Sequence, residues 1–493
     1  MTDQTKRPHR RRTKIVATLG PATDDADMLE ALIDAGADVL RINFSHGSEA
    51  EQRERVGVVR DTAKRMGTNI AIMGDLQGPK IRIESFAAGS AMLEQGQEFV
   101  LDTDMDPSGG DATAVGVAYD KLIEDVGPGD MLLLDDGQIV LEVREVEASR
   151  VHCSVLEGGR LADNKGLNKS GGGLSAPALT DKDRTDIRLA AELGFDFVSV
   201  SFARKAKDIR EARALLRAAG GQAHIVAKIE RAEAVKNINK IIAASDVIMV
   251  ARGDLAVEVG YAALTGLQKG LIRRTRMRNK VSITATQMLE SMIHHASPTR
   301  AEVSDVANAV MDGTDAVMLS AETAVGKYPV QAVRTMSELC MGAEKHESFR
   351  RATNQRLDDV FEQVDEAIAM AAMYVANHFR VAAIIALTES GTTTLWMSRV
   401  RTDIPIYAFT RHEATRNRVR LYRGVYAAPF DVVEVQADTV HLEAFRVLHD
   451  QGAIAPGDLV LFTTGDVRGV EGRTNTLQII EVPKDIGVQT FSG

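Results

Sequence analysis

The sequence predicts an α/β protein built on a (β/α)8 TIM barrel, with an inserted all-β domain and a C-terminal α/β domain. Three observations support this prediction. Short apolar runs rich in Val and Ile recur along the chain, and each ends in polar residues and is followed by a helix-like pattern, which is typical of parallel βα units. One interval between these runs is much longer than the others, and after the last run a new α/β pattern begins.

The recurring runs account for a closed barrel. They begin at Lys14, Val39, Ile70, Phe197, His224, Val247, Val281 and Ala316. The third interval is 127 residues long, whereas the other six run from 23 to 35 residues. Eight units at this spacing describe a (β/α)8 barrel, and the long interval predicts an insertion after the third strand.

The inserted stretch, roughly Pro79 to Pro177, has a different residue pattern from the barrel. MLLLDDGQIVLEVREV predicts two alternating strands around an Asp-Asp-Gly turn, and EFVLD and RVHCSVL predict further strands. Because the insertion leaves the carboxyl end of a barrel strand, we expect this small all-β domain to lie over the barrel mouth as a lid. The glycines of Gly171–Gly173 are interpreted as a hinge in preference to a phosphate-binding loop.

The pattern restarts after about Arg350 with the amphipathic stretch VDEAIAMAAMYVANHF, followed by VAAIIALT, IPIYAFT, GDLVLFTTG and LQIIEV. We therefore expect three domains. These are a barrel over 1–78 and 178–350, a lid over 79–177 and a C-terminal domain over 351–493.

Composition excludes several classes of protein. The chain has 493 residues with 59 Lys and Arg against 69 Asp and Glu, a net charge of −10, which disfavours a general nucleic-acid binder. Its two cysteines, Cys153 and Cys340, lie outside any CxxC spacing, so no disulfide framework or thiolate zinc site is expected. No run is apolar enough to span a membrane, and we expect a cytoplasmic protein. The basic first twelve residues are expected to form a solvated tail.

Polar side chains concentrate where the predicted barrel strands run into loops, the place where barrel enzymes keep their reactive groups. Any one of them could be an ordinary capping or salt-bridge residue, but their convergence on one mouth indicates a site. They are Arg41, Asn43, Ser45, His46, Asp75, Ser201, Lys228, Glu230, Arg252, Gly253, Asp254, Thr286, Gln287 and Glu322.

The carboxylates at this mouth suggest a divalent cation. Lys228 and Glu230 are two apart on a strand and point to the same side, and Asp254 follows the adjacent strand. Two bare carboxylates so placed repel each other, and Mg²⁺ bound to oxygen ligands removes that cost. With Arg41, the set predicts a magnesium site for an anionic, phosphorylated substrate, against the alternative of a structural ion-pair network.

Other positive charge and free backbone N–H groups accompany this predicted site. Gly253 and Asp254 open a segment whose N–H groups could bind a substrate carboxylate. Arg82 and Lys165 lie in the lid. Neither GxxxxGK[ST] nor GxGxxG occurs, so side chains and metal must hold the phosphates of any nucleotide.

Taken together, the motifs resemble one family over nearly the whole chain. TKIVATLGPAT, RINFSHG, GDLQGPKIR, NKGLNK, VSFARKAKD, AKIERAEA, VARGDLAVE, TATQMLESMI and PTRAEVSDVANAVMDGTDAVMLSAETAVGKYP are similar to pyruvate kinase motifs. The resemblance implies an ATP:pyruvate 2-O-phosphotransferase of the last step of glycolysis. Such an enzyme transfers a phosphoryl group from phosphoenolpyruvate to ADP and gives pyruvate and ATP.

The resemblance also implies roles for individual residues. Lys228 resembles the lysine that neutralises the phosphoryl group in flight, and Glu230 and Asp254 resemble Mg²⁺ ligands, with Mn²⁺ as an alternative ion. Arg41 resembles the phosphate-binding arginine and Thr286 the threonine beside the enolate. The remaining residues fall into two groups: Ser201, Phe202, Gly253 and Asp254 on the substrate side, and Asn43, His46, Arg82 and Lys165 on the nucleotide side.

One departure from the family pattern concerns a monovalent cation. Lys80 occupies a position where many members have a glutamate that accompanies a K⁺ requirement, although Asn43, Ser45 and Asp75 keep the cation-pocket pattern. The ammonium of Lys80 can supply the charge of the ion. We therefore expect little activation by K⁺. A second departure, Ala256 in GDLA, bears only on local backbone geometry.

In the C-terminal domain, the hydroxyl-rich stretch TESGTTT allows two interpretations, a helix N-cap or an allosteric phosphate site. The resemblance favours the second, with Thr388, Ser390, Thr392 and Thr393 as donors to a sugar monophosphate or AMP. It also implies a homotetramer.

Two other functions compete with this interpretation. One is a Mg²⁺-dependent lyase of a related barrel type, which would lack the lid cations Arg82 and Lys165. The other is a catalytically idle metabolite sensor, which the intact set of Lys228, Glu230 and Asp254 disfavours.

Overall fold

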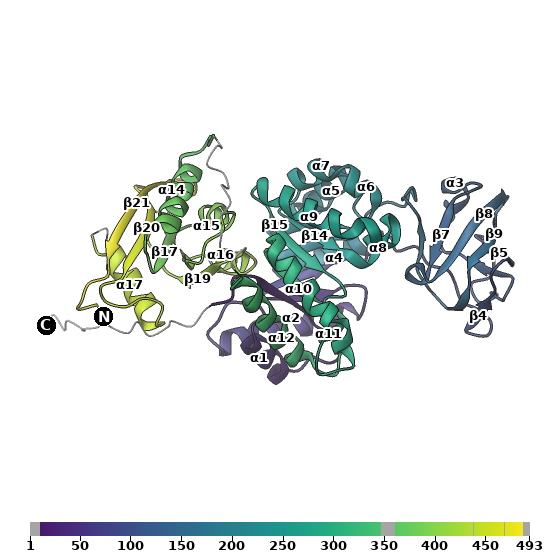
Figure 1. The fold of residues 1–493 in the computed structure, drawn as a ribbon, viewed down its shortest axis with the longest axis horizontal. Helices are drawn as coiled ribbons and strands as arrows, with labels where there is room; N and C mark the ends of the chain where they lie inside the picture. The colour runs from purple at the N-terminus through teal and green to yellow at the C-terminus, as the bar shows by residue number, and fades with distance from the viewer. Residues whose placement is uncertain (1–9, 347–359, 437, 468, 487–493) are drawn as a thin grey trace.

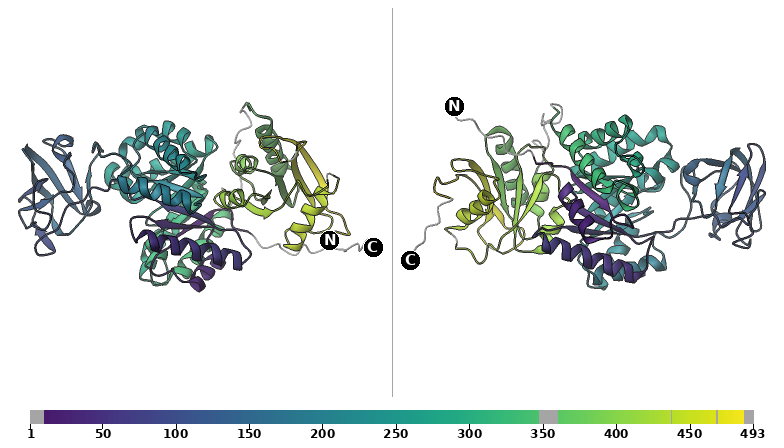
Figure 2. Two further views of the ribbon diagram at one scale, coloured as in Figure 1. Left: turned by 180° about the vertical axis from the view of Figure 1, so that it is seen from behind. Right: turned by 90° about the horizontal axis from the view of Figure 1, so that it is seen from below.

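Three bodies follow one another along the long axis of the molecule, with a barrel in the middle (Figure 1). The computed structural model describes residues 10–346, 360–436, 438–467 and 469–486. The inserted β domain projects from one end of the barrel and the C-terminal domain lies against the other, as the two further views in Figure 2 also show.

Eight parallel strands close the barrel in the order β1-β16-β15-β14-β13-β12-β3-β2. They are β1 (Lys14–Thr18), β2 (Val39–Asn43), β3 (Ala71–Asp75), β12 (Phe197–Val200), β13 (His224–Ile229), β14 (Val247–Ala251), β15 (Val281–Ala285) and β16 (Ala316–Leu319). Strand β3 pairs directly with β12, with Met73 opposite Phe197. The inserted residues therefore leave the barrel after one strand and return at the adjacent strand. The predicted barrel is confirmed, and only the third strand starts one residue later than expected.

Helices surround the strands. They are α1 (Ala26–Ala35), α2 (Glu49–Arg65), α4 (Asp181–Glu192), α5 (Ala206–Ala218), α6 (Ala232–Lys236), α7 (Ile238–Ala244), α8 (Arg252–Val259), α9 (Tyr261–Met277), η2 (Glu290–Ile293), α10 (Arg300–Asp312), α11 (Ala321–Ala324) and α12 (Pro329–Glu344). Side chains set several of their starts: Ser48, Thr180 and Thr299 each form a capping box with the residue three positions later.

Alternation along the barrel strands builds two apolar layers. Ile15, Ile72 and Ile248 belong to a cluster that packs under the helices, whereas Val16, Met73 and Met249 belong to a second cluster. The second cluster also contains residues of the C-terminal domain, such as Trp396 and Tyr422. Because both faces of each strand are buried, near-continuous apolar runs are required, and this is the pattern that made the strands recognisable.

The inserted residues form two sheets together with one short α-helix and one 3-10 turn; below they are called the lid, after their predicted role. The larger sheet has the order β11-β7-β8-β9-β5-β6 and the smaller pairs β10 with β4. The elements of the lid are β4 (Ser90–Leu93), β5 (Glu98–Asp102), β6 (Ala114–Gly116), α3 (Leu122–Asp125), β7 (Met131–Leu134), η1 (Asp135–Gly137), β8 (Ile139–Glu147), β9 (Arg150–Glu157), β10 (Gly159–Ala162) and β11 (Leu167–Lys169). The predicted turn at Asp135–Gly137 joins β7 to β8, with Asp135 and Asp136 both at positive φ.

The C-terminal domain has one five-stranded sheet of order β19-β18-β17-β20-β21, in which only β21 runs antiparallel. Its elements are α14 (Val364–His378), β17 (Ala383–Leu387), α15 (Thr392–Ser398), β18 (Ile406–Thr410), α16 (Glu413–Val419), β19 (Val425–Pro429), α17 (Val440–Asp450), β20 (Leu459–Gly465) and β21 (Thr474–Glu481). Strand β19 was not expected from the sequence, because VYAAP lacks an extended Val- and Ile-rich run.

The basic N-terminal segment departs from the expected solvated tail, of which residues 1–9 lie outside the described residues. Arg11 bonds to Asp38 at the barrel base (2.9 Å), and the backbone N–H of Arg12 donates to Glu344 of α12 (3.0 Å). Arg12 also reaches the carbonyl of Thr402 in the C-terminal domain (2.8 Å). The prediction is wrong for these two arginines, because the buried carboxylates of Asp38 and Glu344, both in the barrel, neutralise them.

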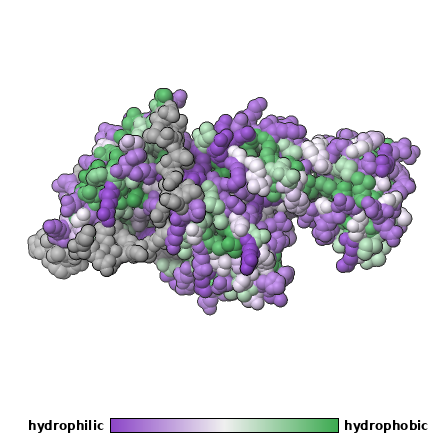
Figure 3. All heavy atoms as spheres, in the orientation of Figure 1, coloured by the Kyte–Doolittle hydropathy of each residue, from purple (hydrophilic) through white to green (hydrophobic). Residues whose placement is uncertain are grey.

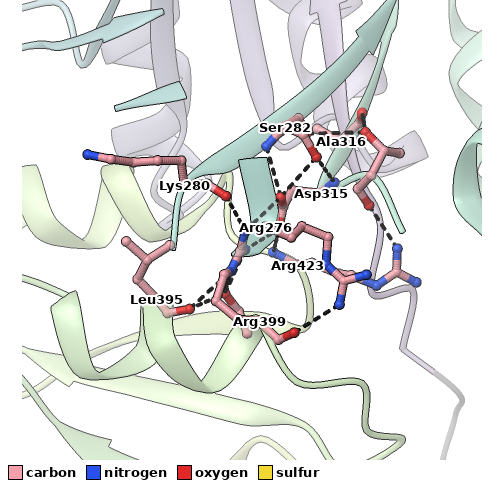
Figure 4. A network of polar contacts seen from close by, with 10 residues as sticks. Arg276, Lys280, Ser282, Asp315, Ala316, Leu395, Arg399 and Arg423 are labelled. Atoms are coloured by element: carbon pink, nitrogen blue, oxygen red, sulfur yellow. Dashed lines mark hydrogen bonds and ion pairs between the residues drawn. The ribbon is translucent and has the colours of Figure 1, made fainter. Parts of the chain in front are cut away.

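Aspartates at the amino ends of four barrel strands tie the barrel base together. Each precedes one strand and accepts a hydrogen bond from a backbone N–H of the neighbouring strand: Asp38 from Ile15, Asp196 from Ile72, Asp246 from Ile225 and Asp315 from Ser282. Asp315 lies at the centre of the polar network in Figure 4, where Arg399, the C-cap residue of α15, pairs with it and Arg276 donates to the carbonyl of Arg399 (2.8 Å). This network joins the barrel base to the C-terminal domain.

Hydrophilic residues dominate the face of the molecule in Figure 3, with apolar patches scattered among them. Among the residues that the structure describes, none of the helices is both long and apolar enough to cross a membrane.

Candidate active site

The candidate site lies where the carboxyl ends of the barrel strands meet the base of the lid. Arg41 belongs to β2, Asp75 ends β3 and Lys228 lies near the end of β13. Glu230 follows β13, and Asp254 lies in the first turn of α8. Parallel strands bring their carboxyl ends to one edge, which is why residues so distant in sequence assemble here.

Lys228 contacts three other residues of the candidate site. Its Nζ lies 2.9 Å from Glu230 Oε1 and 3.4 Å from Asp75 Oδ1, and it donates to the hydroxyl of Ser201 at 2.8 Å. Ser201 in turn donates to the carbonyl of Leu76 at 2.7 Å. The expectation that Lys228 and Glu230 share one side of their strand is confirmed by this contact.

Arg41 reaches the same cluster from the opposite side of Asp75. Its Nη2 lies 2.6 Å from Asp75 Oδ2, and its Nη1 donates to the hydroxyl of Thr18 at 3.0 Å. Asp75 is 1% exposed and lies between two cations, Arg41 and Lys228. The sequence placed Asp75 among the strand-end residues and in a cation pocket but did not show its pairing with Lys228, which lies on β13, far from β3 in the chain.

The electrostatics of the cluster favour a charged lysine. Burial acts to lower the pKa of the Lys228 ammonium, but Asp75 and Glu230 outweigh burial and raise it above its ordinary value. Burial acts in the opposite sense on Asp75, yet Lys228 and Arg41 hold the pKa of that carboxyl below its usual range. The cluster therefore favours the charged form of a lysine whose side chain is only 13% exposed.

Glu230 is in a different electrostatic position. Burial raises the pKa of its carboxyl, and the charge of Asp254 raises it further, against the opposing effect of Lys228. The backbone N–H of Phe202 donates to Glu230 Oε2 at 2.7 Å, from a residue at positive φ (53°). A buried, oriented carboxylate that repels a second carboxylate is stabilised by a cation between them. No group of three or more His, Cys, Asp or Glu side chains in the described ranges could hold a metal ion.

The segment that opens α8 faces Thr286. The backbone N–H of Gly253 donates to Thr286 Oγ1 at 2.8 Å, so the expected cradle for a carboxylate is closed by a hydroxyl in this structure. Thr286 and Gln287 both adopt positive φ, at 68° and 54°. Arg252 accounts for this unusual backbone, because it donates to the carbonyl of Thr286 at 2.7 Å and pairs with Asp305 at 2.6 Å.

Two of the strand-end residues serve the scaffold. Arg252 holds the loop after β15, and Glu322 accepts hydrogen bonds from the backbone N–H groups of Leu289 (3.1 Å) and Ser320 (2.6 Å). Both side chains are buried. Among the polar residues at the strand ends, Glu322 is therefore an ordinary capping residue.

Residues assigned to the nucleotide side contact their local surroundings. Lys165 Nζ pairs with Asp135 of the lid at 2.7 Å, and Arg82 donates to the carbonyl of Asn164 at 2.8 Å. Asn43 accepts from the backbone N–H of Ser45 at 3.1 Å, and His46 is exposed. These four residues thus surround the mouth without touching the Lys228 cluster.

Lys80 points at the candidate metal ligands. Its Nζ lies 3.3 Å from Asp254 Oδ1, and the lid strand passes close above it, because a Cβ on Gly166 would lie 3.1 Å from Lys80 Cε. Lys80 thus supplies positive charge beside Asp254.

The hydroxyl-rich stretch of the C-terminal domain lines a cavity. Thr388, Ser390, Thr392 and Thr393 all belong to its wall, together with Arg473 and Thr474. Gly391, at φ 84°, turns the chain so that its N–H donates to Thr388 Oγ1 at 2.9 Å. The N-cap interpretation is wrong, because Gly391 is the N-cap residue of α15 and no side chain of the described residues caps this helix. The effector site stays a prediction.

Comparison with known proteins connects the geometry to a family. A family model described as "Pyruvate kinase, barrel domain" matches residues 10–333, and one described as "Pyruvate kinase, alpha/beta domain" matches residues 366–480. The chain is 54% identical over 476 residues to pyruvate kinase II of Salmonella typhimurium, covering 96% of this chain and 99% of that protein. It is 50% identical over 470 residues to the pyruvate kinase of Haemophilus influenzae, covering 94% and 97%. The pyruvate kinase of Geobacillus stearothermophilus is 41% identical over 473 residues, covering 95% and 80%.

Proposed function

Because this chain belongs to the pyruvate kinase family, we propose that its barrel mouth transfers a phosphoryl group from phosphoenolpyruvate to ADP and gives pyruvate and ATP. It is a phosphotransferase of glycolysis. The observation that carries the proposal to this site is the buried ammonium of Lys228, held between two carboxylates and next to Arg41. Family membership disfavours the lyase and the idle sensor that the sequence alone left open.

The test is a pyruvate-release assay with phosphoenolpyruvate, ADP and Mg²⁺ that compares the wild type with Lys228→Met. The wild type is expected to release pyruvate and the variant to lose nearly all of this activity. A wild type without activity would refute the proposal.

Phosphoryl transfer spreads negative charge over the moving group, so positioned cations are the main source of catalysis. In our proposal, Arg41 binds the phosphate of phosphoenolpyruvate and Lys228 neutralises the group as it moves. Thr286 lies beside the enolate that remains, while Ser201, Phe202, Gly253 and Asp254 line the substrate side. Support comes from the 2.8 Å bond between Gly253 and Thr286, which puts the substrate-side segments within one site.

The residues also fit a Mg²⁺ ion, with Mn²⁺ as an alternative. Glu230 and Asp254 are the proposed ligands, and the fit rests on the burial of the Glu230 carboxyl, which is 1% exposed and oriented by the backbone N–H of Phe202 at 2.7 Å. A divalent ion bound there would screen the phosphate oxygens. Glu230 and Asp254 supply only two carboxylates, which suits Mg²⁺ because it keeps several positions for water and substrate oxygens.

For the nucleotide, we propose Asn43, His46, Arg82 and Lys165. Two of them lie on the barrel and two on the lid, so ADP would bridge the domains and favour lid closure, which excludes water from the reacting phosphoryl group. On closure Lys165 would exchange Asp135 for a nucleotide phosphate.

We also propose that the enzyme needs no K⁺. Lys80 reaches Asp254 at 3.3 Å, and the carboxylate of Asp75 is already engaged by Arg41 and Lys228, so little charge is left in the pocket of Asn43, Ser45 and Asp75 for a free ion. Replacing K⁺ by a tetraalkylammonium salt is expected to leave the rate nearly unchanged. A large loss of rate would overturn this proposal.

The cavity of Thr388, Ser390, Thr392 and Thr393 is our candidate for an effector site, for a sugar monophosphate or AMP. Titration of each ligand should shift the apparent affinity for phosphoenolpyruvate, and the shift should disappear in Thr393→Val. No shift with any such ligand would contradict the proposal.

We further propose that the chain divides into the three domain ranges given above and that the protein has a cytoplasmic location. We also propose a homotetramer, which light scattering can test.

A further inference from the structure

A buried ion pair joins the two segments that carry the proposed metal ligands. Arg231 Nε and Glu258 Oε1 are 3.0 Å apart, and the two side chains are 4% and 1% exposed. Neither residue was singled out in the sequence. An ion pair this deeply buried is costly to leave incomplete, so its geometry constrains the segments that carry it.

Those segments are the ones that carry the carboxylates. Arg231 follows Glu230 directly, and Glu258 lies four residues after Asp254 in α8, on the same side of that helix. Glu258 Oε2 also accepts from the backbone N–H of Ala232 at 2.8 Å, at the start of α6. The pair therefore sets how far apart the Glu230 segment and the Asp254 segment lie.

The same residues hold the irregular segment by which the inserted domain returns to the barrel after β11. The backbone N–H of Gly171 donates to the carbonyl of Glu258 at 2.8 Å, and Arg231 Nη2 donates to the carbonyl of Leu174 at 3.1 Å. Gly173 N–H donates to Glu233 Oε1 at 2.7 Å. The approach is close, since a Cβ on Gly172 would lie 2.5 Å from Glu233 Oε2. The predicted glycine hinge is thus docked against the back of the site.

Hydrogen bonding in this cluster is incomplete. Among the described residues, nine buried side-chain N or O atoms lack a hydrogen-bond partner, and four of them lie here: Arg204 Nε, Arg231 Nε, Glu233 Oε2 and Glu258 Oε1. Arg231 and Glu258 are close enough to attract each other without a well-directed bond. A small rotation of the lid segment can therefore tighten the pair, because the atoms that would bond are already adjacent.

We propose that the Arg231–Glu258 pair is a positioning element that couples the lid hinge to the spacing of the Glu230 and Asp254 carboxylates. Movement of the 171–174 segment alters the distance between Arg231 and Glu258. That distance in turn alters the spacing of the Glu230 and Asp254 carboxylates that would bind the ion. The inference rests on the proposed metal site at Glu230 and Asp254. Outer-shell partners of metal ligands commonly alter metal affinity by about 10–100-fold.

The experiment measures Mn²⁺ binding by calorimetry and hydrogen exchange of the peptide spanning 168–176, both on the full chain without substrate. Arg231→Gln is expected to weaken Mn²⁺ binding about tenfold and to speed exchange in the peptide. Arg231→Lys keeps the charge beside Glu258 but cannot also reach Leu174, so it should speed exchange while the Mn²⁺ affinity stays close to that of the wild type. Arg213→Gln, which removes the Asp246 pair at the opposite end of the barrel, is the control and should change neither readout.

Two comparisons decide the outcome. If Asp254→Asn weakens Mn²⁺ binding and Arg231→Gln does not, the positioning role is overturned while the metal site stands. If Asp254→Asn binds Mn²⁺ like the wild type, the metal site is wrong and the inference fails with it. Should Arg231→Gln not fold, Glu258→Gln serves in its place and is expected to behave in the same way.

Discussion

Arg399, directly after α15, and Asp315, directly before β16, form an ion pair in which each side chain is only 1% exposed. The pair joins the C-terminal domain to the barrel base, and Arg423 adds a bond to the neighbouring carbonyl of Thr314 at 2.8 Å. This contact lies at the opposite end of the barrel from the candidate active site. It belongs to stability and domain association and not to the proposed chemistry.

Arg399→Met is expected to destabilise the protein by about 3–5 kcal/mol, because it leaves a buried carboxylate with an incomplete set of partners. The free energy of unfolding in urea measures the effect. Arg411→Met removes a more exposed pair with Glu389 (3.3 Å) and should cost about 1 kcal/mol or less. Equal losses in the two variants would show that burial of the pair does not matter.

Lys228→Met should lower kcat by at least about 10²–10³-fold, because it removes a cation aimed at developing negative charge. Circular dichroism and the unfolding midpoint establish that the variant is folded. Lys236→Met changes an exposed lysine at the end of α6 and should leave kcat unchanged. A similar kcat for both variants would remove Lys228 from the proposed mechanism.

Gly74→Ala is expected to destabilise the barrel by about 1–3 kcal/mol through overpacking. A Cβ at Gly74 would lie 2.6 Å from Phe44 Cε2 and 3.0 Å from the Phe195 ring. Gly57→Ala in α2 is the matched control, since a Cβ there meets nothing within 4 Å and should stabilise the helix by about 0.5–1 kcal/mol. Thermal unfolding of both variants gives the comparison, and a stabilised Gly74→Ala would contradict the packing argument.

The imidazole of His224, at the start of β13, gives a pH-dependent prediction. Burial lowers its pKa to about 3, with Arg418 and Arg213 acting in the same sense and Asp246 opposing. As the pH falls below about 6.5, the imidazole takes up a proton in the unfolded chain but stays neutral in the folded chain. The contribution of this residue to stability therefore declines down to about pH 3.

His224→Gln removes this titration. The free energy of unfolding of the variant should therefore rise relative to that of the wild type as the pH falls from 7 to 4, measured in urea at several pH values. A difference between the two proteins that does not vary with pH would contradict the assignment.

Several parts of the fold and site followed from local pattern. The barrel strands were recognisable because burial on both faces demands apolar runs, and the contact of Lys228 with Glu230 followed from the two-residue period of a strand. The role of Asp75 between Arg41 and Lys228 did not follow, since it depends on three strands closing around one point. Arg231 and Glu258 left a weak signal, each lying close in sequence to a proposed ligand, but nothing local showed that they would meet.

The N-terminal arginines illustrate the same limit. A run of basic residues predicts a solvated segment when only its own charge is considered. Arg11 and Arg12 are instead neutralised by Asp38 and Glu344, which lie 27 and 332 positions away in the chain. Their burial was therefore decided by partners that no local pattern identifies.

The repeating βα units, the inserted domain and the family motifs can be recognised in the linear chain, because they depend on periodicity and on residues close together in it. Which charges neutralise one another, how Gly171–Gly173 contact the Arg231 and Glu258 segments, and which strand-end residues serve the scaffold became evident only from the folded chain. Electrostatic energy depends on distance and burial in space, and barrel closure brings together groups that the chain keeps far apart.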